Sequence, residues 1–402
     1  MYQTIVIGAG PAGSYLAYSL ARLGYKVLVL DKKAEIGQDI CCTGIVGKEC
    51  LDSFGIDESL ILRHASSARF IAPSGESFRL WRDGEVSYVL ERPALDLSLA
   101  GRAEEAGAEY ILDARVTNIR FGDDCLQIDV DCCEESKIFE ADTAVIAAGF
   151  GTSLPGKLDL GKIDDFIIGA QARVSVAEIN EVEIYLDQVL APGGFAWLVP
   201  TRNGEGLAGL LTRYQPGLYL GNFLGHLNER GKITSTDVEM NYGAIPLRPL
   251  PRSYTDRILV VGESAGQVKP TTGGGIYYGL LCANMAVDSL HQAFLANDFS
   301  AAELSSYEKR WHDKLDRELR IGYWAHKLYG RLSNNQIERL THFAGDNGIS
   351  SLVAASSEFS FDWHSGLILK MMKHFAVNSP LQTIGLIGVL LGCLRSSRHS
   401  VG

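Results

Sequence analysis

The hydrophobic pattern at the start of the chain predicts a β-α-β unit. Residues 2–8 form an apolar, β-branched run, which is typical of a buried strand. Residues 12–23 then carry leucines at helical spacing, and Gly24 is placed to end the helix. A second apolar run, residues 26–30, ends at Asp31. The whole unit takes about 30 residues, the size of one crossover.

The remaining pattern predicts a discontinuous α/β fold. Residues 92–106 read as a helix, and residues 109–121, 124–131 and 137–148 as strands. Alternating runs within residues 165–245 favour an antiparallel sheet, residues 257–261 a buried strand, and residues from 275 a long helix. We therefore predict a Rossmann-like FAD-binding domain with an inserted antiparallel-sheet substrate domain and a C-terminal helical region. The predicted divisions are 1–60 with 92–160 and 250–298, then 61–91 with 161–249, then 299–402.

Composition narrows the function classes. The 402 residues carry a formal net charge of −11, which argues against a nucleic-acid partner because phosphate binding needs clustered positive charge. The eight cysteines show no CxxC and no framework of a secreted protein, so we expect a reduced, cytoplasmic setting. No basic segment or cleavage site precedes the first strand, so we expect no signal peptide. His291, His312 and His326 lack metal-ligand spacing; we predict that they are solvated or capped, and we assign no metal.

One apolar stretch near the C-terminus leaves two interpretations open. Residues 381–394 are too few to span a membrane, which takes about 18 or more apolar residues. The stretch is either a buried terminal helix or an interfacial element, with Arg395 and Arg398 meeting lipid phosphates. The second interpretation predicts a peripheral membrane contact through residues 381–398.

The first chemical motif is the turn Gly8-Ala9-Gly10-Pro11-Ala12-Gly13 between the first strand and helix. Gly8 permits the tight turn, Gly10 lets the backbone approach a diphosphate, and Gly13 lets helix and strand pack closely. The diphosphate then lies at the positive end of the helix. Asp31, followed by Lys32, is placed to accept hydrogen bonds from a ribose diol. The motif predicts a dinucleotide site but does not separate NAD from FAD.

A second motif, within residues 257–276, distinguishes FAD from NAD. A buried strand ends at Gly262-Glu263, from which a carboxylate can reach a ribityl hydroxyl. Pro270-Thr-Thr-Gly-Gly-Gly275 then leads into a helix at Ile276, whose free N–H groups can face the N1–C2=O edge of a flavin. Three consecutive glycines would destabilise a helix interior by about 1 kcal/mol each. They suit a backbone that lies against a flat ring, so the motif predicts FAD.

Together these motifs resemble the geranylgeranyl reductase family, within the flavoproteins related to p-hydroxybenzoate hydroxylase. The resemblance covers residues 1–295 and rests on GAGPAG, the cysteine-glycine loop near residue 42, ERPxLD at 91–96 and GExxGxxxPTTGGGI. It implies isoprenoid double bonds as substrate. It also implies site residues beyond the two motifs. The FAD-binding set gains Cys42, Thr43, Gly44, Ile45, Arg92, Val116, Gly149, Gly274 and Gly275, and the substrate-binding set is Phe195, Trp197 and Pro200.

Three positions depart from the family pattern. Glu263 replaces an aspartate and lengthens the arm by one methylene. Ala148-Gly149 stands where the hydroxylases have an Asp-Gly pair linked to NADPH, so we expect electrons from an external donor such as a ferredoxin. Leu211 occupies the place of the second glycine after Trp197.

The resulting hypothesis is reduction of isoprenoid (geranylgeranyl) C=C bonds, with a polyprenyl lipid as the expected substrate, by hydride transfer from reduced FAD. The proton comes from Cys42, a tyrosine or water; Cys42 is otherwise a small hydrophobe beside the ring. A flavin monooxygenase or halogenase acting on a small hydrophobic substrate is the alternative. An electron-transfer flavoprotein–quinone oxidoreductase would need clustered C-terminal cysteines, and only Cys393 lies there. A non-enzymatic flavin-binding protein leaves the glycine-rich loop without a purpose.

Overall fold

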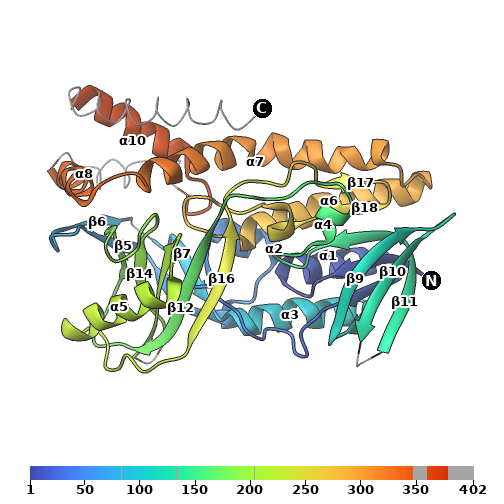
Figure 1. Ribbon diagram of the computed structural model, residues 1–402, viewed down its shortest axis with the longest axis horizontal. Coiled ribbons are helices and arrows are strands. Elements are labelled where there is room, and N and C mark those ends of the chain that lie inside the picture. The colour runs from blue at the N-terminus through green and yellow to red at the C-terminus, as the bar shows by residue number, and fades with distance from the viewer. Residues whose placement is uncertain (83, 133–134, 203, 347–359, 379–402) are drawn as a thin grey trace.

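An eight-stranded sheet with a parallel centre and a seven-stranded sheet lie in two lobes of the molecule, and the long helix α7 (Ala301–Tyr329) runs across both (Figure 1). The computed structural model describes residues 1–378, apart from 83, 133–134, 203 and 347–359. The first lobe contains the predicted β-α-β unit, formed by β1 (Tyr2–Ile7), α1 (Pro11–Arg22) and β2 (Val27–Leu30). Gly24 follows α1 in the left-handed region at φ +87°, as its place after the helix predicts.

The first sheet has the strand order β17-β18-β11-β1-β2-β8. All pairs between β18 and β8 are parallel, and β17 pairs antiparallel at the edge. The strands not yet bounded are β8 (Glu109–Ile111), β11 (Glu135–Ile146), β17 (Tyr254–Thr255) and β18 (Ile258–Val260). The order is that of a doubly wound nucleotide-binding sheet, which places ligands at the carboxyl ends of the strands.

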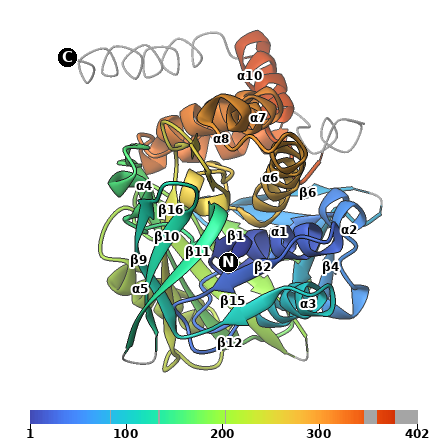
Figure 2. The ribbon, with the colours of Figure 1, turned by 90° about the vertical axis from the view of Figure 1, so that its right-hand side faces the viewer.

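The parallel strands are buried on both faces, and their side chains alternate between two cores. Val6, Val29 and Val145 face one core with α1, α3 (Arg92–Glu105) and α6 (Ile276–Ala296). Ile7 and Leu30 face the other core, which β9 (Ala114–Phe121) and β10 (Leu126–Cys132) cover. Figure 2 shows β1 and β2 between these two layers. Near-continuous apolar strands follow from this two-sided burial.

One predicted strand is wrong in its extent. Residues 109–121 form two strands, β8 and β9, because the chain turns at Asp113, whose φ is +50°. The turn is fixed by backbone hydrogen bonds from Asp113 N to Lys33 O and from Ala114 N to Asp31 O. The chain thereby leaves the parallel sheet and enters the antiparallel β9-β10-β11 meander.

The second large sheet has seven strands in the order β16-β12-β15-β14-β13-β5-β6. It is antiparallel, as predicted, except for one parallel pair between β13 and β5. Its strands are β5 (Ser67–Ile71), β6 (Ser77–Trp81), β12 (Phe166–Ser175), β13 (Val182–Tyr185), β14 (Ala196–Pro200), β15 (Glu205–Thr212) and β16 (Met240–Pro246). Helix α5 (Pro216–Glu229) covers one face with Leu220, Phe223, Leu224 and Leu227. The face of this sheet that α5 does not cover is turned toward the first lobe.

A three-stranded sheet joins the two lobes. It has the order β3-β7-β4, formed by β3 (Ile45–Gly47), β7 (Ser87–Leu90) and β4 (Ile61–Ala65). Helix α2 (Lys48–Phe54) and the short helices η1 (Glu58–Leu60) and α4 (Leu154–Lys157) complete the connections. Segment 61–91 is therefore shared: β5 and β6 enter the large sheet, while β4 and β7 pair with β3.

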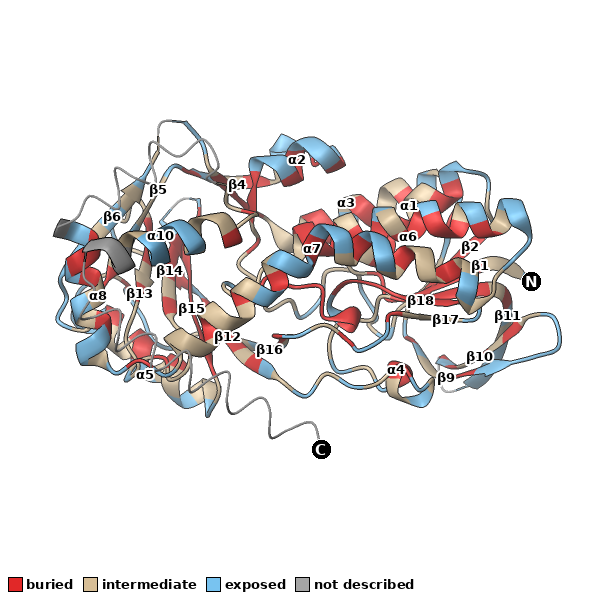
Figure 3. Cartoon of the chain, turned by 90° about the horizontal axis from the view of Figure 1, so that it is seen from above, coloured by how far each residue is buried: buried red, intermediate tan, exposed pale blue. Residues whose placement is uncertain are grey.

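The C-terminal region is helical over its described part, with α7 (Ala301–Tyr329), α8 (Asn334–Asp346) and α10 (Ser365–Asn378). Buried residues concentrate in the strands and along α1 and α6 (Figure 3). No described helix has the length and apolar character needed to cross a membrane. Residues 381–398, with their two interpretations, lie outside the described residues.

The prediction for the helical histidines is wrong for His326. His326 is 5% exposed, and burial lowers its pKa to about 4. Apolar helical spacing placed it inward, where α7 packs on the large sheet. His291 and His312 do have polar partners: Tyr25 Oη lies 2.7 Å from His291 Nδ1, and His312 Nδ1 lies 2.6 Å from Asp316 Oδ1.

Candidate functional site

The glycine turn after β1 brings strand and helix into contact that side chains would prevent. A Cβ on Gly13 would lie 2.0 Å from Gly8 O, and a Cβ on Gly8, at φ +114°, would lie 2.3 Å from Ala147 O. A Cβ on Gly10 would meet no atom within 4 Å. Helix α1 begins after Gly10 without a side-chain cap. Gly10 and the first N–H groups of α1 therefore face open space, where an anion would be stabilised.

Asp31 closes this turn from the end of β2. Its Oδ2 accepts a hydrogen bond from Ala9 N at 2.6 Å, and its Oδ1 accepts one from Lys33 N at 2.9 Å. A carboxylate has about four acceptor positions, so two remain for a ribose diol. Lys32 is exposed, whereas the Lys33 ammonium donates to the carbonyls of Gln38 and Asp39.

The cysteine-glycine loop meets the start of α3. Gly44, at φ +73°, has no room for a side chain, because a Cβ would lie 2.4 Å from Leu90 O. The Arg92 guanidinium contacts the Cys42 thiol and donates to Asp96 Oδ1 at 2.8 Å. Burial lowers the pKa of Arg92, but Cys42 and Asp96 outweigh it, so the net pKa lies above the ordinary value. Arg92 Nε is buried without a hydrogen-bond partner among the described residues.

The same loop is held on the large sheet by a residue that the sequence did not single out. Gln171 Oε1 accepts from Thr43 Oγ1 at 2.7 Å, and Gln171 Nε2 donates to Cys42 O at 3.3 Å. The signal was a polar residue, 6% exposed, between Ala170 and Ala172 in an apolar strand. Cys41 points away from Cys42, with its Sγ 3.4 Å from Asn241 O, and burial raises its pKa to about 12.

Glu263 lies where three of the expected cofactor contacts meet. A Cβ on Gly275 would be 3.2 Å from Glu263 Oε1, and one on Gly149 would be 3.9 Å from Oε2. Dense surrounding protein raises the pKa of Glu263, although its side chain is exposed. Gly262 lies behind it against α1, since a Cβ on Gly262 would be 3.3 Å from the Cβ of Ala12.

The glycine loop before α6 is shaped by the protein itself. Only Gly273 has a positive φ, +74°; a Cβ on Gly274 would lie 2.8 Å from Lys269 Cε. Backbone hydrogen bonds from Lys269 N to Gly274 O and from Gly273 N to Lys269 O close the loop. The chain's own atoms thus require small residues here, in addition to any ring that lies against them. Ile276 begins α6 directly after the loop.

A distant segment supports this loop from behind. Lys269 Nζ lies 3.2 Å from Asp362 Oδ1, and both side chains are at most 4% exposed. Thr271 Oγ1 lies 2.7 Å from His364 Nδ1. Burial lowers the pKa of Lys269 and raises that of Asp362, while their mutual attraction opposes both changes. Sequence reasoning missed this pair, because 93 residues separate its members.

Two of the three expected substrate residues, Phe195 and Trp197, lie on the face of the seven-stranded sheet opposite α5, whereas Pro200 alternates with them and lies on the α5 side with Ala196 and Leu198. The rings of Phe195 and Trp197 are 5.9 Å apart. They form an apolar cluster with Ile167, Leu211, Leu247, Ile245 and Tyr323. A Cβ on Gly209 would lie 2.5 Å from Trp197 Cζ2, so this glycine makes room for the indole. Pro200 is buried at the end of β14.

The other expected cofactor residues occupy strand positions. Val116 is half-buried on β9, next to the register shift opposite Val130. Ile45 begins β3 opposite Val89. Neither makes a side-chain polar contact, and any role rests on its backbone or apolar surface.

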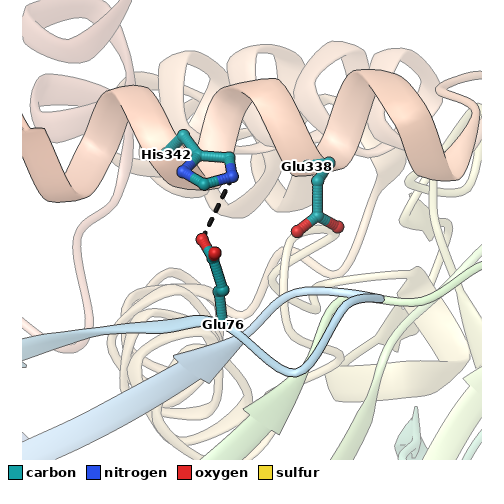
Figure 4. A group of neighbouring side chains, drawn as sticks. All are labelled: Glu76, Glu338 and His342. Carbon is teal, nitrogen blue, oxygen red and sulfur yellow. Dashed lines mark ion pairs between the residues drawn. The ribbon is translucent and has the colours of Figure 1, made fainter.

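One exposed cluster has the donor types of a metal site. Glu76, Glu338 and His342 bring their ligand atoms within 4.8 Å of one another (Figure 4). His342 Nε2 is 3.0 Å from Glu76 Oε2, and Glu338 accepts from Ser74 N at 3.2 Å. These contacts tie α8 to the β5-β6 hairpin, which explains the cluster without an ion.

Comparison with known proteins places the chain in a family. A family model described as pyridine nucleotide-disulphide oxidoreductase matches residues 2–181. Digeranylgeranylglycerophospholipid reductase 2 of Methanopyrus kandleri is 31% identical over 370 residues, 88% of this chain and 92% of that protein. The chain belongs to the digeranylgeranylglycerophospholipid reductase family. A reductase of the same name from Methanothermobacter thermautotrophicus is also 31% identical, over 87% of this chain and 94% of its own length.

Solved structures share the fold of this family member. A geranylgeranyl bacteriochlorophyll reductase-like protein from Thermoplasma acidophilum has a TM-score of 0.83 at 23% identity, covering 96% of this chain and 99% of its own. A flavin-dependent brominase has a TM-score of 0.69 at 14% identity, covering 94% and 100%. The family and the fold make this chain an FAD-dependent oxidoreductase, as the sequence predicts.

The residues in place fit FAD. The open space before Gly10 and the uncapped start of α1 suit a diphosphate. The unpartnered Arg92 Nε and the accessible carboxyl of Glu263 offer a donor and an acceptor to a polyhydroxyl chain. Asp31 retains acceptor positions for a ribose. These groups would meet the diphosphate, the ribityl chain and a ribose of FAD.

Proposed function

We propose that this member of the family saturates C=C bonds in the isoprenoid chains of a digeranylgeranylglycerophospholipid, using reduced FAD. The names of its relatives, at about 30% identity over nearly the whole chain, are the observation that carries this proposal. FAD, when bound, supplies the hydride. An external reduced carrier such as a ferredoxin would supply electrons, because Ala148 stands where the related hydroxylases have an aspartate.

Positioning is the main catalytic task of the protein. An unactivated alkene develops no oxyanion that hydrogen bonds could stabilise, so the rate depends on holding it near the hydride donor in a dry site. The apolar cluster of Phe195, Trp197, Leu211 and Ile245 provides such a surface. It lies against the glycine loop, since a Cβ on Gly273 would be 3.0 Å from Ile245 Cδ1.

The geometry favours Cys42 as proton donor to the second alkene carbon. Its Sγ receives a contact from Gly44 N at 3.4 Å and lies beside the Arg92 guanidinium. The guanidinium is positively charged and the amide N–H is a hydrogen-bond donor, so both would stabilise the charge left on sulfur after proton donation. The thiol is half-exposed, unlike the buried Cys50, and can reach a bound molecule.

The test is an anaerobic single turnover. Chemically reduced holoenzyme is mixed with the unsaturated phospholipid, and flavin absorbance and lipid mass are followed together. Flavin reoxidation with a gain of about two mass units per double bond supports the proposal. Reduced flavin that persists with every prenyl lipid, but yields a hydroxylated or halogenated product with oxygen, would assign the protein to the monooxygenase class instead.

A further inference from the structure

A second group of charged residues lies at the rim of the apolar cluster. Asp165 precedes β12, Arg213 follows β15, and Lys327 occupies the last turn of α7. Asp165 Oδ1 is 2.7 Å from Arg213 Nη1, and its Oδ2 is 2.8 Å from both Lys327 Nζ and Tyr323 Oη. Arg248 lies over the Tyr323 ring at 5.2 Å. We call Arg213, Arg248 and Lys327 the basic rim.

The basic rim carries more charge than its contacts neutralise. The basic rim and Asp165 together hold three cations and one carboxylate, a net charge of +2 in a chain of net charge −11, and only Arg213 and Lys327 are paired with that carboxylate. Hydrogen bonds from Lys327, Arg213 and Tyr323 outweigh burial and lower the pKa of Asp165 to about 2, so it stays ionised. Within the described part of the chain Arg248 makes no ion pair, and it is exposed. Arg213 and Lys327 are 26% and 29% exposed, open enough to meet a ligand.

The rim is continuous with the expected substrate surface. Tyr323 joins the basic rim to the apolar cluster, because its hydroxyl donates to Asp165 and its ring packs against the group formed by Ile167, Leu211 and Leu247. The same cluster also borders the glycine loop, where a Cβ on Gly273 would lie 3.0 Å from Ile245 Cδ1 and 3.9 Å from Leu211 Cδ1. A molecule with a charged end and apolar chains would therefore find cations for its charge beside an apolar surface that reaches the glycine loop.

We propose that the basic rim binds the phosphate group of the prenyl substrate while its chains lie along the apolar cluster. This inference rests on the proposed function and identifies the substrate's charged end. Guanidinium groups suit phosphate oxygens because they can donate two parallel hydrogen bonds. Exposed rings flank the rim, since Phe166 and Tyr214 directly follow Asp165 and Arg213 and are 42% and 65% exposed. Aromatic rings beside cations suit the interface of a lipid head and its chains.

A purely structural role predicts something different. The contacts to Asp165 also attach the end of α7 to β12 and β15, and such ion pairs would serve without any ligand. In that case substitutions at the rim would affect stability, or all substrates alike. They would not distinguish a substrate with a phosphate from one without it.

The experiment uses Arg248→Met in the holoenzyme, because Arg248 contacts only a ring and its loss leaves Asp165 paired. Arg252→Met is the matched control, since Arg252 is also exposed and lies over a tyrosine ring, that of Tyr254, at 4.7 Å. kcat/KM is measured for the digeranylgeranylglycerophospholipid and for digeranylgeranylglycerol, which has the same chains without phosphate. The ratio of the two values should fall about tenfold in Arg248→Met and stay at the wild-type value in Arg252→Met. Arg248→Lys should recover part of the loss.

Two further arms complete the test. Geranylgeranyl diphosphate as a third substrate separates sources: a loss confined to it assigns the rim to free prenyl diphosphates, and a loss confined to the phospholipid assigns it to lipid heads. If the wild type reduces none of these lipids, the proposed function is refuted but the basic rim can still be tested. Its test is then the affinity for the same lipids, measured by equilibrium titration of the protein fluorescence. Equal ratios and equal affinities in wild type and Arg248→Met would overturn the inference.

Discussion

Two alanine substitutions in one glycine motif should separate folding from cofactor binding. In Gly13→Ala the new Cβ would lie 2.0 Å from Gly8 O, a backbone atom, whereas real Cβ contacts stay beyond 3.0 Å. The helix and strand must then separate by about 1 Å, and overpacking of this kind costs about 1–3 kcal/mol. In Gly10→Ala the Cβ meets nothing within 4 Å, and φ is −72°. That substitution should leave the folded protein intact or stabilise it by about 0.4–1 kcal/mol.

For FAD binding, unlike for stability, Gly10→Ala should be a damaging substitution. The space that receives the Gly10→Ala methyl is where a diphosphate would approach the backbone, so we expect FAD affinity to fall at least about tenfold, the equivalent of roughly 1.4 kcal/mol. Gly101→Ala is the matched control, since its Cβ also meets nothing within 4 Å and it lies inside α3. It should gain similar stability and keep wild-type FAD affinity.

Both quantities are measured on the FAD-free protein. Its unfolding midpoint reports stability, and titration with FAD, followed by quenching of flavin fluorescence, reports the dissociation constant. The reasoning fails if Gly10→Ala binds FAD as tightly as wild type, because the diphosphate then does not lie against this backbone. It also fails if Gly10→Ala loses as much stability as Gly13→Ala, because the space before Gly10 is then not open.

Three other predictions concern the rest of the site and its supports. Cys42→Ser should lower kcat for lipid reduction by about 10²-fold, as loss of a general acid does, whereas Cys41→Ser should stay close to wild type in steady-state assays; equal losses would exclude Cys42 as proton donor. Asp362→Asn leaves the buried Lys269 ammonium without its partner and should cost about 3–5 kcal/mol in urea unfolding, with much of the loss recovered in the Lys269→Met/Asp362→Asn double variant. His326, with a folded pKa of about 4 against an ordinary 6.5, contributes stability that is complete above pH 6.5 and lost as the pH falls toward 4. His326→Phe should therefore flatten the unfolding midpoint across that window, and an unchanged slope would show that this histidine is not buried in its neutral form.

The local parts of the cofactor site could be predicted because their causes are local. Gly8, Gly10 and Gly13 are fixed by how closely a strand, a turn and a helix approach within a dozen residues. Their roles follow from sterics that any chain with this spacing obeys. The burial of both faces of β1 and β2 could likewise be predicted, because their sequences are continuous apolar runs. The pairing of Cys42 with Arg92 could be suggested only through the family resemblance, because 50 residues separate them.

Hydrophobic periodicity was less informative where one pattern is compatible with two different local structures. The run 109–121 has the pattern of a single strand, yet the turn at Asp113 divides it into a parallel and an antiparallel strand. His326 sits on an apolar helix face, which correctly implies burial, but its polarity suggested solvent. In both cases packing against another element overrides the local preference.

The sequence by itself determined the nucleotide-binding unit, its glycine roles, the two-sheet organisation and the family. Only the tertiary structure decided which polar residues meet. Gln171 reaches the cysteine loop across 128 residues, and Asp362 reaches Lys269 across 93. Lys327 of α7 and Arg213 at the end of β15 meet at Asp165, which precedes β12. A side chain's partner across such distances depends on where whole strands and helices cross. These crossing positions are set by burial of the apolar faces of the strands and helices. Because hydrophobic burial is non-directional, the local sequence around a polar residue does not indicate its distant partner.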